Sequence, residues 1–195
     1  KYRSFELKSS RISPYFFKTG PLISGRAADD LGSCYADAAV ESGISFDRIF
    51  GPAYKGIPLA ALTAAALAEN HDRDVPYCFN RKEAKAHGEG GNIVGASVTN
   101  KVLIVDDVIT AGTAVRDAVN IIRAAGGEPA GVLLALDRQE KGTGSLSAVQ
   151  EVENALRIRV VSIIRLEDLI AHLAREPDCK DLLDTMMIYR QRYGT

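Results

Sequence analysis

The sequence is poor in residues that cross-link a chain. It has only three cysteines among 195 residues, Cys34, Cys78 and Cys179, which are widely spaced and form no C-x-x-C pair. An odd number of scattered cysteines argues against a disulfide framework and against a zinc knuckle. We therefore expect these cysteines to be reduced, and either buried or incidental to function.

The sequence also lacks an excess of one charge and any long apolar run. Its 24 basic and 25 acidic residues give a formal net charge of -1, so no overall field attracts nucleic acid or an anionic membrane. No apolar run approaches the roughly 20 residues of a membrane span, and no basic-then-apolar leader opens the chain. We expect a cytoplasmic protein that binds neither nucleic acid nor membranes, and whose anion sites are local.

The remaining composition is that of a compact α/β protein. With 46% hydrophobic and 25% charged residues, a chain of this length can bury one sizeable core. Strand-like segments alternate with helical patterns, which predicts a mainly parallel central sheet flanked by helices. Residues 5–8 and 15–18 instead predict a hairpin. We expect a single domain, residues 1–195, with a small N-terminal hood (mainly 1–22) and a core (about 23–195).

Apolar periodicity and turn residues predict the elements of that core. The expected strands cover residues 48–50, 75–79, 102–105, 130–136 and 159–163. The expected helices cover about 27–41, 58–69, a stretch that ends at 125, about 145–156, and the tail. Pro177 lies near a helix start in the tail, and Gly43 and Gly126 stand where glycine commonly ends a helix.

The most informative segment runs from residue 102 to 113. Four aliphatic residues without alternation are typical of a parallel strand covered on both faces. Asp106 and Asp107 follow at its carboxyl end, where open α/β sheets bind ligands, and ionised carboxylates suit a sugar diol because they only accept hydrogen bonds. Residues 110–113 are small and begin a helix, which suits a phosphate. We interpret the segment as a ribose-phosphate cradle; the alternative is a helix entry capped by acidic and hydroxyl residues.

A second segment, residues 80–91, is a loop rich in cations and glycine. Its four potential cations are Arg81, Lys82, Lys85 and His87. A loop of this kind can open and close, and its cations can stabilise an anion that develops during a reaction. The alternative is a solvated turn, because Glu83 and Glu89 dilute the positive charge.

Two single cations follow other expected strands. Lys55 is the only charge of the segment 51–56, which lies between a strand and a helix, a suitable place for an anion loop. Arg138 follows the strand 130–136. The alternatives are a turn with an exposed lysine and an exposed arginine beside acidic neighbours.

Three of these segments resemble motifs of one enzyme family. Residues 102–113 are similar to the phosphoribosyl pyrophosphate (PRPP) motif of the type I phosphoribosyltransferases, four apolar residues then D-D-x-x-T-x-G-T, and match it at every defining position. Residues 80–91 resemble the mobile catalytic loop, R-K-x-x-K-x-H-G, of the orotate phosphoribosyltransferases. Residues 5–17 resemble their F-x-L-K-S-G-x-x-S-P-Y-F sequence, with Ser10 in place of the glycine. The resemblance covers essentially the whole chain and implies the type I phosphoribosyltransferase fold.

The resemblance implies an activity and its partners. Members of this family transfer the phosphoribosyl group from PRPP to orotate, giving orotidine 5′-monophosphate and diphosphate, in de novo pyrimidine biosynthesis. It implies Mg²⁺ as the cofactor, held mainly through PRPP and water with no dedicated protein cage, and a homodimer whose loop 80–91 reaches into the neighbouring site. Two alternatives remain: a phosphoribosyltransferase for another base, and a PRPP-binding regulator without catalysis, which would not need the cations of the loop.

The resemblance also implies roles for single residues. The catalytic set is Arg81, Lys82, Lys85, His87 and Asp107. The PRPP contacts are Lys8, Tyr54, Lys55, Arg81, Lys82, Lys85, His87, Asp106, Asp107, Val108, Ile109, Thr110, Ala111, Gly112 and Thr113. The orotate contacts are Lys8, Phe16, Phe17, Thr110 and Arg138. Because neighbouring residues of an extended segment point to opposite faces, one of Phe16 and Phe17 is expected in the core.

Overall fold

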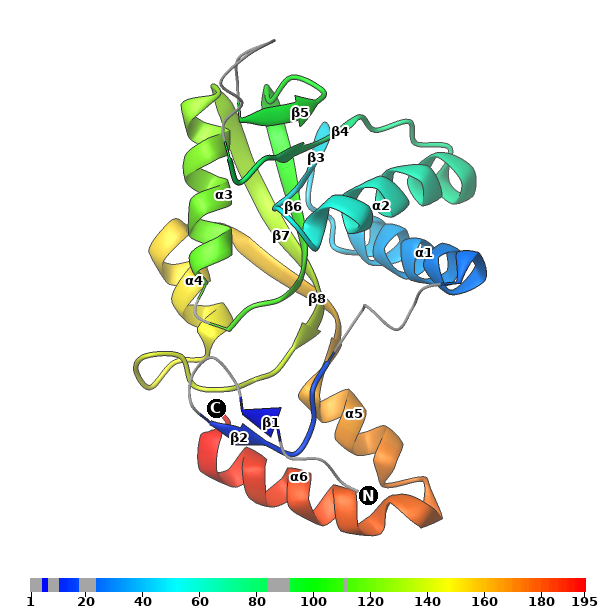
Figure 1. The fold of residues 1–195 in the computed structure, drawn as a ribbon, viewed down its shortest axis with the longest axis vertical. Helices are drawn as coiled ribbons and strands as arrows, with labels where there is room; N and C mark the ends of the chain where they lie inside the picture. The colour runs from blue at the N-terminus through cyan, green and yellow to red at the C-terminus, as the bar shows by residue number, and fades with distance from the viewer. Residues whose placement is uncertain (1–4, 7–10, 18–23, 84–91, 111) are drawn as a thin grey trace.

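The chain forms a six-stranded sheet with helices on both faces (Figure 1). The computed structural model describes residues 5–6, 11–17, 24–83, 92–110 and 112–195. The sheet has the order β5-β4-β3-β6-β7-β8 and is parallel except for the antiparallel pair β4–β5. Its strands are β3 (Arg48–Gly51), β4 (Tyr77–Asn80), β5 (Ile93–Gly95), β6 (Asn100–Val108), β7 (Gly127–Asp137) and β8 (Arg159–Arg165). The expected mainly parallel α/β sheet is confirmed.

Two helices cover each face of this sheet. Helices α1 (Gly25–Glu41) and α2 (Gly56–His71) lie on one face, and α3 (Thr113–Ala124) and α4 (Ala148–Leu156) lie on the other (Figure 1). Successive side chains of the central strand β6 alternate between the two faces. Leu103 and Val105 therefore belong to the apolar cluster under α1 and α2, whereas Val102 and Ile104 belong to the cluster under α3 and α4. Burial on both faces explains the uninterrupted apolar run of this strand.

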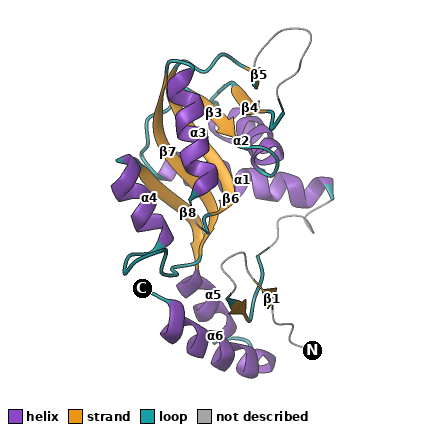
Figure 2. Cartoon of the chain, turned by 60° about the vertical axis from the view of Figure 1, so that its left-hand side comes forward, coloured by secondary structure: helices purple, strands orange, loops and turns teal. Residues whose placement is uncertain are grey.

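A smaller part of the structure packs at one end of the sheet. The strands β1 (Phe5–Glu6) and β2 (Ile12–Ser13) pair antiparallel, and helices α5 (Leu166–Leu173), η1 (Pro177–Cys179) and α6 (Lys180–Tyr193) lie beside them (Figures 1 and 2). The Tyr15 ring meets the edge of the Tyr189 ring at 6.2 Å between centroids, and Arg11 lies over Tyr193. The N-terminal hairpin and the C-terminal helix α6 thus pack together.

The hairpin differs from its prediction. The expected strand over residues 15–18 is wrong, because the second strand is β2, and the described residues 15–17 are not in a strand. Pro14 has no N–H with which to continue the pairing. The Tyr15 N–H donates instead to Ser13 Oγ at 3.3 Å, which turns the chain away from the hairpin.

Two strands of the large sheet also differ from the strands predicted from the sequence. The short edge strand β5 was not predicted, because its residues show no clear alternation. Strand β6 runs past residue 105 to Val108, since β7 is long enough to pair Val108 with Leu136. Asp106 and Asp107 therefore lie inside the strand, near its end, and not after it. The other expected elements are present, with ends displaced by a few residues. Within the described residues, no helix has both the length and the apolarity needed to cross a membrane.

Candidate active site

The site lies where the chain connections of the sheet change direction. From β3 the chain passes through α2 to β4 on one side, and from β6 it passes through α3 to β7 on the other. The loops that leave the carboxyl ends of β3 and β6 therefore diverge, and the space between them is where open α/β sheets are expected to have a ligand crevice. The anion loop 51–56 and the cradle 102–113 both reach this crevice.

Lys55 and Asp107 join the two loops across the crevice. Lys55 Nζ donates to Asp107 Oδ2 at 2.5 Å. The Asp107 side chain is 5% exposed, whereas that of Lys55 is 61% exposed. Alternation along β6 places Asp107 on the face covered by α1 and α2, and Lys55 immediately precedes α2. Asp107 thus has a fixed position, and Lys55 has a cationic end that solvent or an anion can reach.

Asp106 is a buried carboxyl group beside Asp107. Its Oδ1 accepts the Asp107 N–H at 2.9 Å, and its main-chain oxygen accepts the hydroxyl of the fully buried Tyr35 at 2.9 Å. Burial raises the pKa of Asp106 from 3.8 to about 6; the Asp107 N–H and Lys55 oppose the rise, and the Asp107 charge adds to it. Lys55 contacts only Asp107 of the two carboxylates, and the remaining acceptor capacity of the pair suits the hydroxyls of a sugar diol.

The loop after β3 is held in place by close backbone contacts. The Ala53 N–H donates to the Asn80 side chain at 2.9 Å, and the peptide bond between Ala53 and Tyr54 is cis. A Cβ added to Gly56 would lie 2.8 Å from Val105 O, so glycine is required there for the loop to approach β6. Tyr54 is exposed, and Lys82 Nζ lies 4.9 Å from the centre of its ring. The start of the loop 80–91 therefore lies against the anion loop.

The segment 102–113 ends at the start of helix α3, the part of it that is expected to bind a phosphate. Gly112 has a φ of 72° and precedes Thr113, the first residue of this 12-residue helix. The exposed Thr110 and Thr113 stand on either side of Gly112, with hydroxyls that can donate to a phosphate. The free N–H groups and the positive end of a helix dipole favour an anion at this position.

We expect Gly112→Ala to lower the free energy of unfolding by about 1–2 kcal/mol, because alanine is strained at a positive φ. An added Cβ would also lie 2.5 Å from Val152 Cγ2, so the start of α3 must shift. Chemical denaturation measures the loss. Gly25→Ala is the matched control, because Gly25 likewise lies at the start of a helix, as the first residue of α1, and nothing lies within 4 Å of its Cβ position. Equal stability of the two variants would contradict the explanation.

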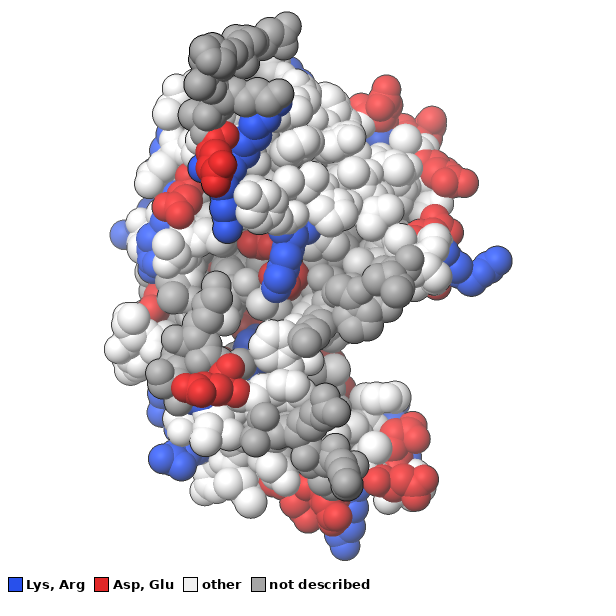
Figure 3. Space-filling view, viewed as in Figure 1, with Lys and Arg blue, Asp and Glu red and all other residues white. Residues whose placement is uncertain are grey.

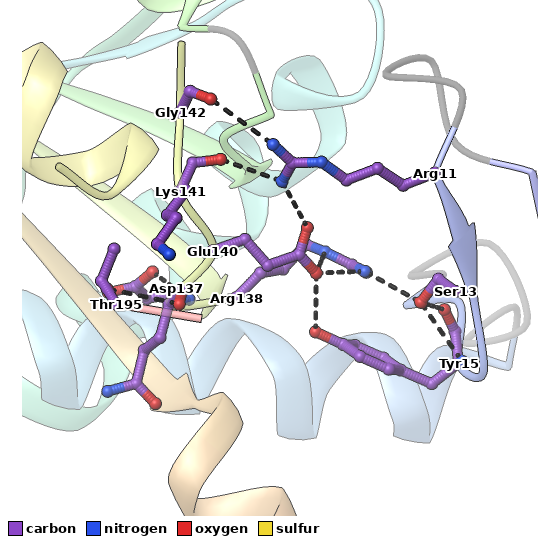
Figure 4. Close-up of polar contacts among 10 residues, drawn as sticks. Arg11, Ser13, Tyr15, Asp137, Arg138, Glu140, Lys141, Gly142 and Thr195 are labelled. Carbon is purple, nitrogen blue, oxygen red and sulfur yellow. Dashed lines mark hydrogen bonds and ion pairs between the residues drawn. The ribbon is translucent and has the colours of Figure 1, made fainter. Parts of the chain in front are cut away.

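Arg138 lines a cavity of about 120 Å³ together with Thr110, Ile109 and Glu140. Its side chain is 6% exposed, and its Nε and Nη2 lie 2.8 and 2.6 Å from Glu140 Oε1 (Figure 4). The alternative of an exposed arginine beside acidic neighbours is therefore wrong. Burial alone would lower the pKa of Arg138, but Tyr15 and Glu140 hold it above its ordinary value. The cavity thus has one permanently cationic wall, and it adjoins the phosphate end of the cradle at Thr110.

The two phenylalanines of the hairpin segment separate as expected. Phe17 packs against the apolar cluster under α1 and α2, which confirms that one of the pair belongs to the core. Phe16 is 41% exposed, and its ring lies 5.5 Å from that of Phe5. Phe16 is therefore the more exposed member of the pair.

Several predicted site residues are not tested by this structure, and others were not predicted. Lys8, Lys85, His87 and Ala111 lie outside the described residues. Sequence reasoning missed Glu140, Ser13 and Tyr15, which surround Arg138. In the sequence, Arg138 and Glu140 stand two residues apart among charged neighbours. That spacing does not show which of these charged side chains contact one another.

Most charged side chains of the described residues are spread over the surface. Among the described residues, no group of three or more His, Cys, Asp or Glu side chains is arranged to hold a metal ion, and all three cysteines are free. On the face drawn in Figure 3, basic and acidic side chains are interspersed among the coloured residues. A nucleic-acid-binding regulator would be expected to have a basic stripe, and the coloured residues on that face do not form one.

Known proteins share both the sequence and the fold of this chain. Residues 28–161 match the family described as "Phosphoribosyl transferase domain". Orotate phosphoribosyltransferases from Edwardsiella ictaluri (strain 93-146) and Enterobacter sp. (strain 638) are 59% and 58% identical over 194 residues, which cover 100% of this chain and 91% of each relative. The crystal structure of orotate phosphoribosyltransferase from Francisella tularensis is 40% identical with a TM-score of 0.87, covering 100% of this chain and 94% of that one. The family match includes both loops of the crevice.

Proposed function

Because the chain belongs to the orotate phosphoribosyltransferases, we propose that the crevice between β3 and β6 carries out the reaction of that family. The enzyme transfers the phosphoribosyl group from PRPP to orotate, giving orotidine 5′-monophosphate and diphosphate in pyrimidine biosynthesis. The observation that carries the assignment to this crevice is the contact of Lys55 with Asp107 across the change of connection direction. It brings a cation for diphosphate and a carboxylate for ribose to the same place.

The ribose and its 5′-phosphate occupy the cradle at the end of β6. Asp106 and Asp107 accept hydrogen bonds from the ribose hydroxyls, and the turn that contains Gly112 binds the 5′-phosphate. The bond from ribose C1 to diphosphate breaks through a transition state in which positive charge develops on the ring. Fixed carboxylates stabilise that charge more than they stabilise the neutral sugar, so they lower the barrier.

The leaving diphosphate is bound by groups on the other side of the crevice. Lys55 and Tyr54 come from the loop after β3, and Lys82 and Arg81 from the loop after β4. Diphosphate gains negative charge as it leaves, and cations brought against it in a site with little water stabilise that charge. We assign the same role to Lys85 and His87 on the strength of the loop motif.

Magnesium fits this arrangement as an ion shared with the substrate. Two carboxylates are near the ribose position, but Asp107 is already paired with Lys55, and the described residues offer no third ligand. Mg²⁺ commonly keeps several waters and binds through substrate phosphates. Asp106 and Asp107 would therefore hold a PRPP-bound Mg²⁺ mainly through its water shell, and the ion would supply positive charge to neutralise the diphosphate.

The base-binding part is the cavity beside Arg138. Orotate is a planar pyrimidine with a carboxylate, so it needs a cation for the carboxylate and apolar contacts for the ring. Arg138 supplies the cation, Thr110 joins this cavity to the cradle, and Phe16 with Lys8 completes the site from the hood.

The family membership also supports a domain organisation, an oligomeric state and a cellular location for this enzyme. We assign a single domain, residues 1–195, with a hood (mainly 1–22) over a core (about 23–195). The enzyme is a homodimer in which the loop 80–91 is shared across the interface: its start, at Arg81 and Lys82, borders the crevice of its own chain, and its motif cations Lys85 and His87 serve the neighbouring site. A cytoplasmic location accords with the three free cysteines.

The test is an assay with Mg²⁺ and PRPP in which the loss of orotate absorbance is followed. Uracil, hypoxanthine and adenine serve as parallel acceptors, and an Arg81→Ala, Lys85→Ala double variant tests the loop. We expect turnover of orotate alone by the native protein and little turnover by the variant. PRPP binding without turnover of any base would contradict the proposed reaction and favour the regulator.

A further inference from the structure

Glu140 is a buried carboxylate at the junction of three segments, and it is not among the groups proposed to bind PRPP or orotate. It is 9% exposed and lies just past the end of β7. Its Oε1 accepts hydrogen bonds from Arg138 and, at 3.4 Å, from the Tyr15 hydroxyl, while its Oε2 lies 3.6 Å from Arg11 Nη1. Figure 4 shows the Glu140 carboxylate in contact with Arg138 of the core and with Arg11 and Tyr15 of the N-terminal segment.

The ion pair between Glu140 and Arg138 uses only some of the N–H groups of Arg138. Glu140 takes Nε and Nη2, and Nη2 also donates to Ser13 Oγ at 3.0 Å. The Tyr189 hydroxyl is a further partner of the guanidinium. The contacts with Glu140 and Ser13 use Nε and Nη2 and leave Nη1 to other partners. An arginine whose Nε–Nη2 edge is fixed presents its Nη1 N–H groups in one direction only, because the guanidinium is planar and rigid.

The same carboxylate connects the core to the hood. Arg11 Nη1 donates to Lys141 O at 2.9 Å beside Glu140, and the Tyr15 ring lies 4.2 Å from the Arg138 guanidinium. Without the Glu140 charge, Arg11 and Arg138 would face each other with no anion between them. Two partly buried cations repel each other strongly in a medium of low dielectric constant.

We propose that Glu140 is a positioning residue for recognition of the orotate carboxylate. It fixes one edge of Arg138, so that the Nη1 side is available to the substrate, and it screens Arg11 from Arg138 so that the hairpin can lie against the base site. The inference rests on the proposed function, because it takes the cavity beside Arg138 as the base site.

The test compares Glu140→Gln with Glu140→Asp and with the control Glu167→Gln. Glu167 also pairs with an arginine, Arg165, but both side chains are exposed. We expect Glu140→Gln to raise the KM for orotate roughly tenfold, since it replaces a charged hydrogen-bond partner by a neutral one. The kcat and the KM for PRPP should change less than about twofold, because bound orotate restores an anion beside Arg138. Glu140→Asp should recover part of the loss, and the control should resemble the native enzyme.

A second ligand separates positioning from a general loosening of the hood. The neutral amide of orotate has the shape of the substrate but lacks the charge that Arg138 recognises. We expect Glu140→Gln to leave its inhibition constant nearly unchanged. An equal loss for orotate and its amide, or an unchanged KM for orotate, would overturn the positioning role. Failure of the native protein to consume orotate would instead overturn the proposed function.

Discussion

Asp107→Asn is expected to lower kcat/KM for PRPP by about a hundredfold or more, because hydrogen bonds to a charged group are worth about 1.5–3 kcal/mol each. The substitution keeps the shape of the side chain, and its Oδ1 can still accept the Val108 N–H, which Asp107 accepts at 2.9 Å. What it removes is the negative charge beneath the ribose and the partner of Lys55. The kcat should fall together with kcat/KM, since the ring becomes more positive in the transition state.

Steady-state kinetics with PRPP as the varied substrate measure this loss. Asp47→Asn is the matched control, because the Asp47 carboxylate also accepts a main-chain N–H, that of Lys101 at 3.0 Å, but it lies at the opposite end of β3 and β6. We expect the Asp47→Asn control to have the kinetics and the thermal stability of the native enzyme, within experimental error. An Asp107→Asn enzyme with native kcat/KM would show that this carboxylate does not act on ribose.

The cradle was predictable from the sequence because its residues are contiguous. A buried strand, two carboxylates, a glycine turn and a helix start all lie within residues 102–113, and each has a local signature. The mainly parallel fold, the family and the orotate reaction predicted from these motifs are confirmed. The exact end of β6 was not predictable, since it depends on how far the distant strand β7 continues beside it.

Contacts between distant segments were beyond the reach of sequence patterns. Lys55 was predicted to lie in an anion loop, but nothing local showed that it pairs with Asp107, 52 residues away. Arg138 was predicted as a base-site residue, but its bond to Ser13 joins residues 125 positions apart. Such pairs depend on packing of the complete fold, so the sequence identified the chemical groups and not their partners in the free protein.

Asp106→Asn is expected to make the protein more stable at neutral pH and less active. The Asp106 side chain is buried, and its pKa of about 6 lies above the value of 3.8 that it has in an unfolded chain. Asparagine is nearly isosteric, and its oxygen can still accept the Asp107 N–H. The variant therefore removes the cost of burying a charge and keeps the local hydrogen bond.

The sign of the pH dependence follows from proton binding. Between pH 3.8 and about 6, the folded protein holds the Asp106 proton more tightly than the unfolded chain does, so the contribution of this group to stability falls as pH rises through this range. Below it, the protonated aspartate resembles asparagine, and the two proteins should have similar stabilities. Above pH 7, the variant should be more stable by about 1–3 kcal/mol, since each unit of pKa shift corresponds to about 1.4 kcal/mol.

Denaturant unfolding of both proteins from pH 4 to 8, without substrate, measures this difference. Asp47→Asn, at an exposed carboxylate, controls for the general effect of removing one negative charge. Asp106→Asn should also lose roughly a hundredfold in kcat/KM for PRPP, because a neutral amide accepts the ribose hydroxyls less strongly than a carboxylate. A stability difference that does not change with pH would show that Asp106 is not held protonated by burial. If both effects are observed, the buried carboxylate is retained for catalysis at a measurable cost in stability.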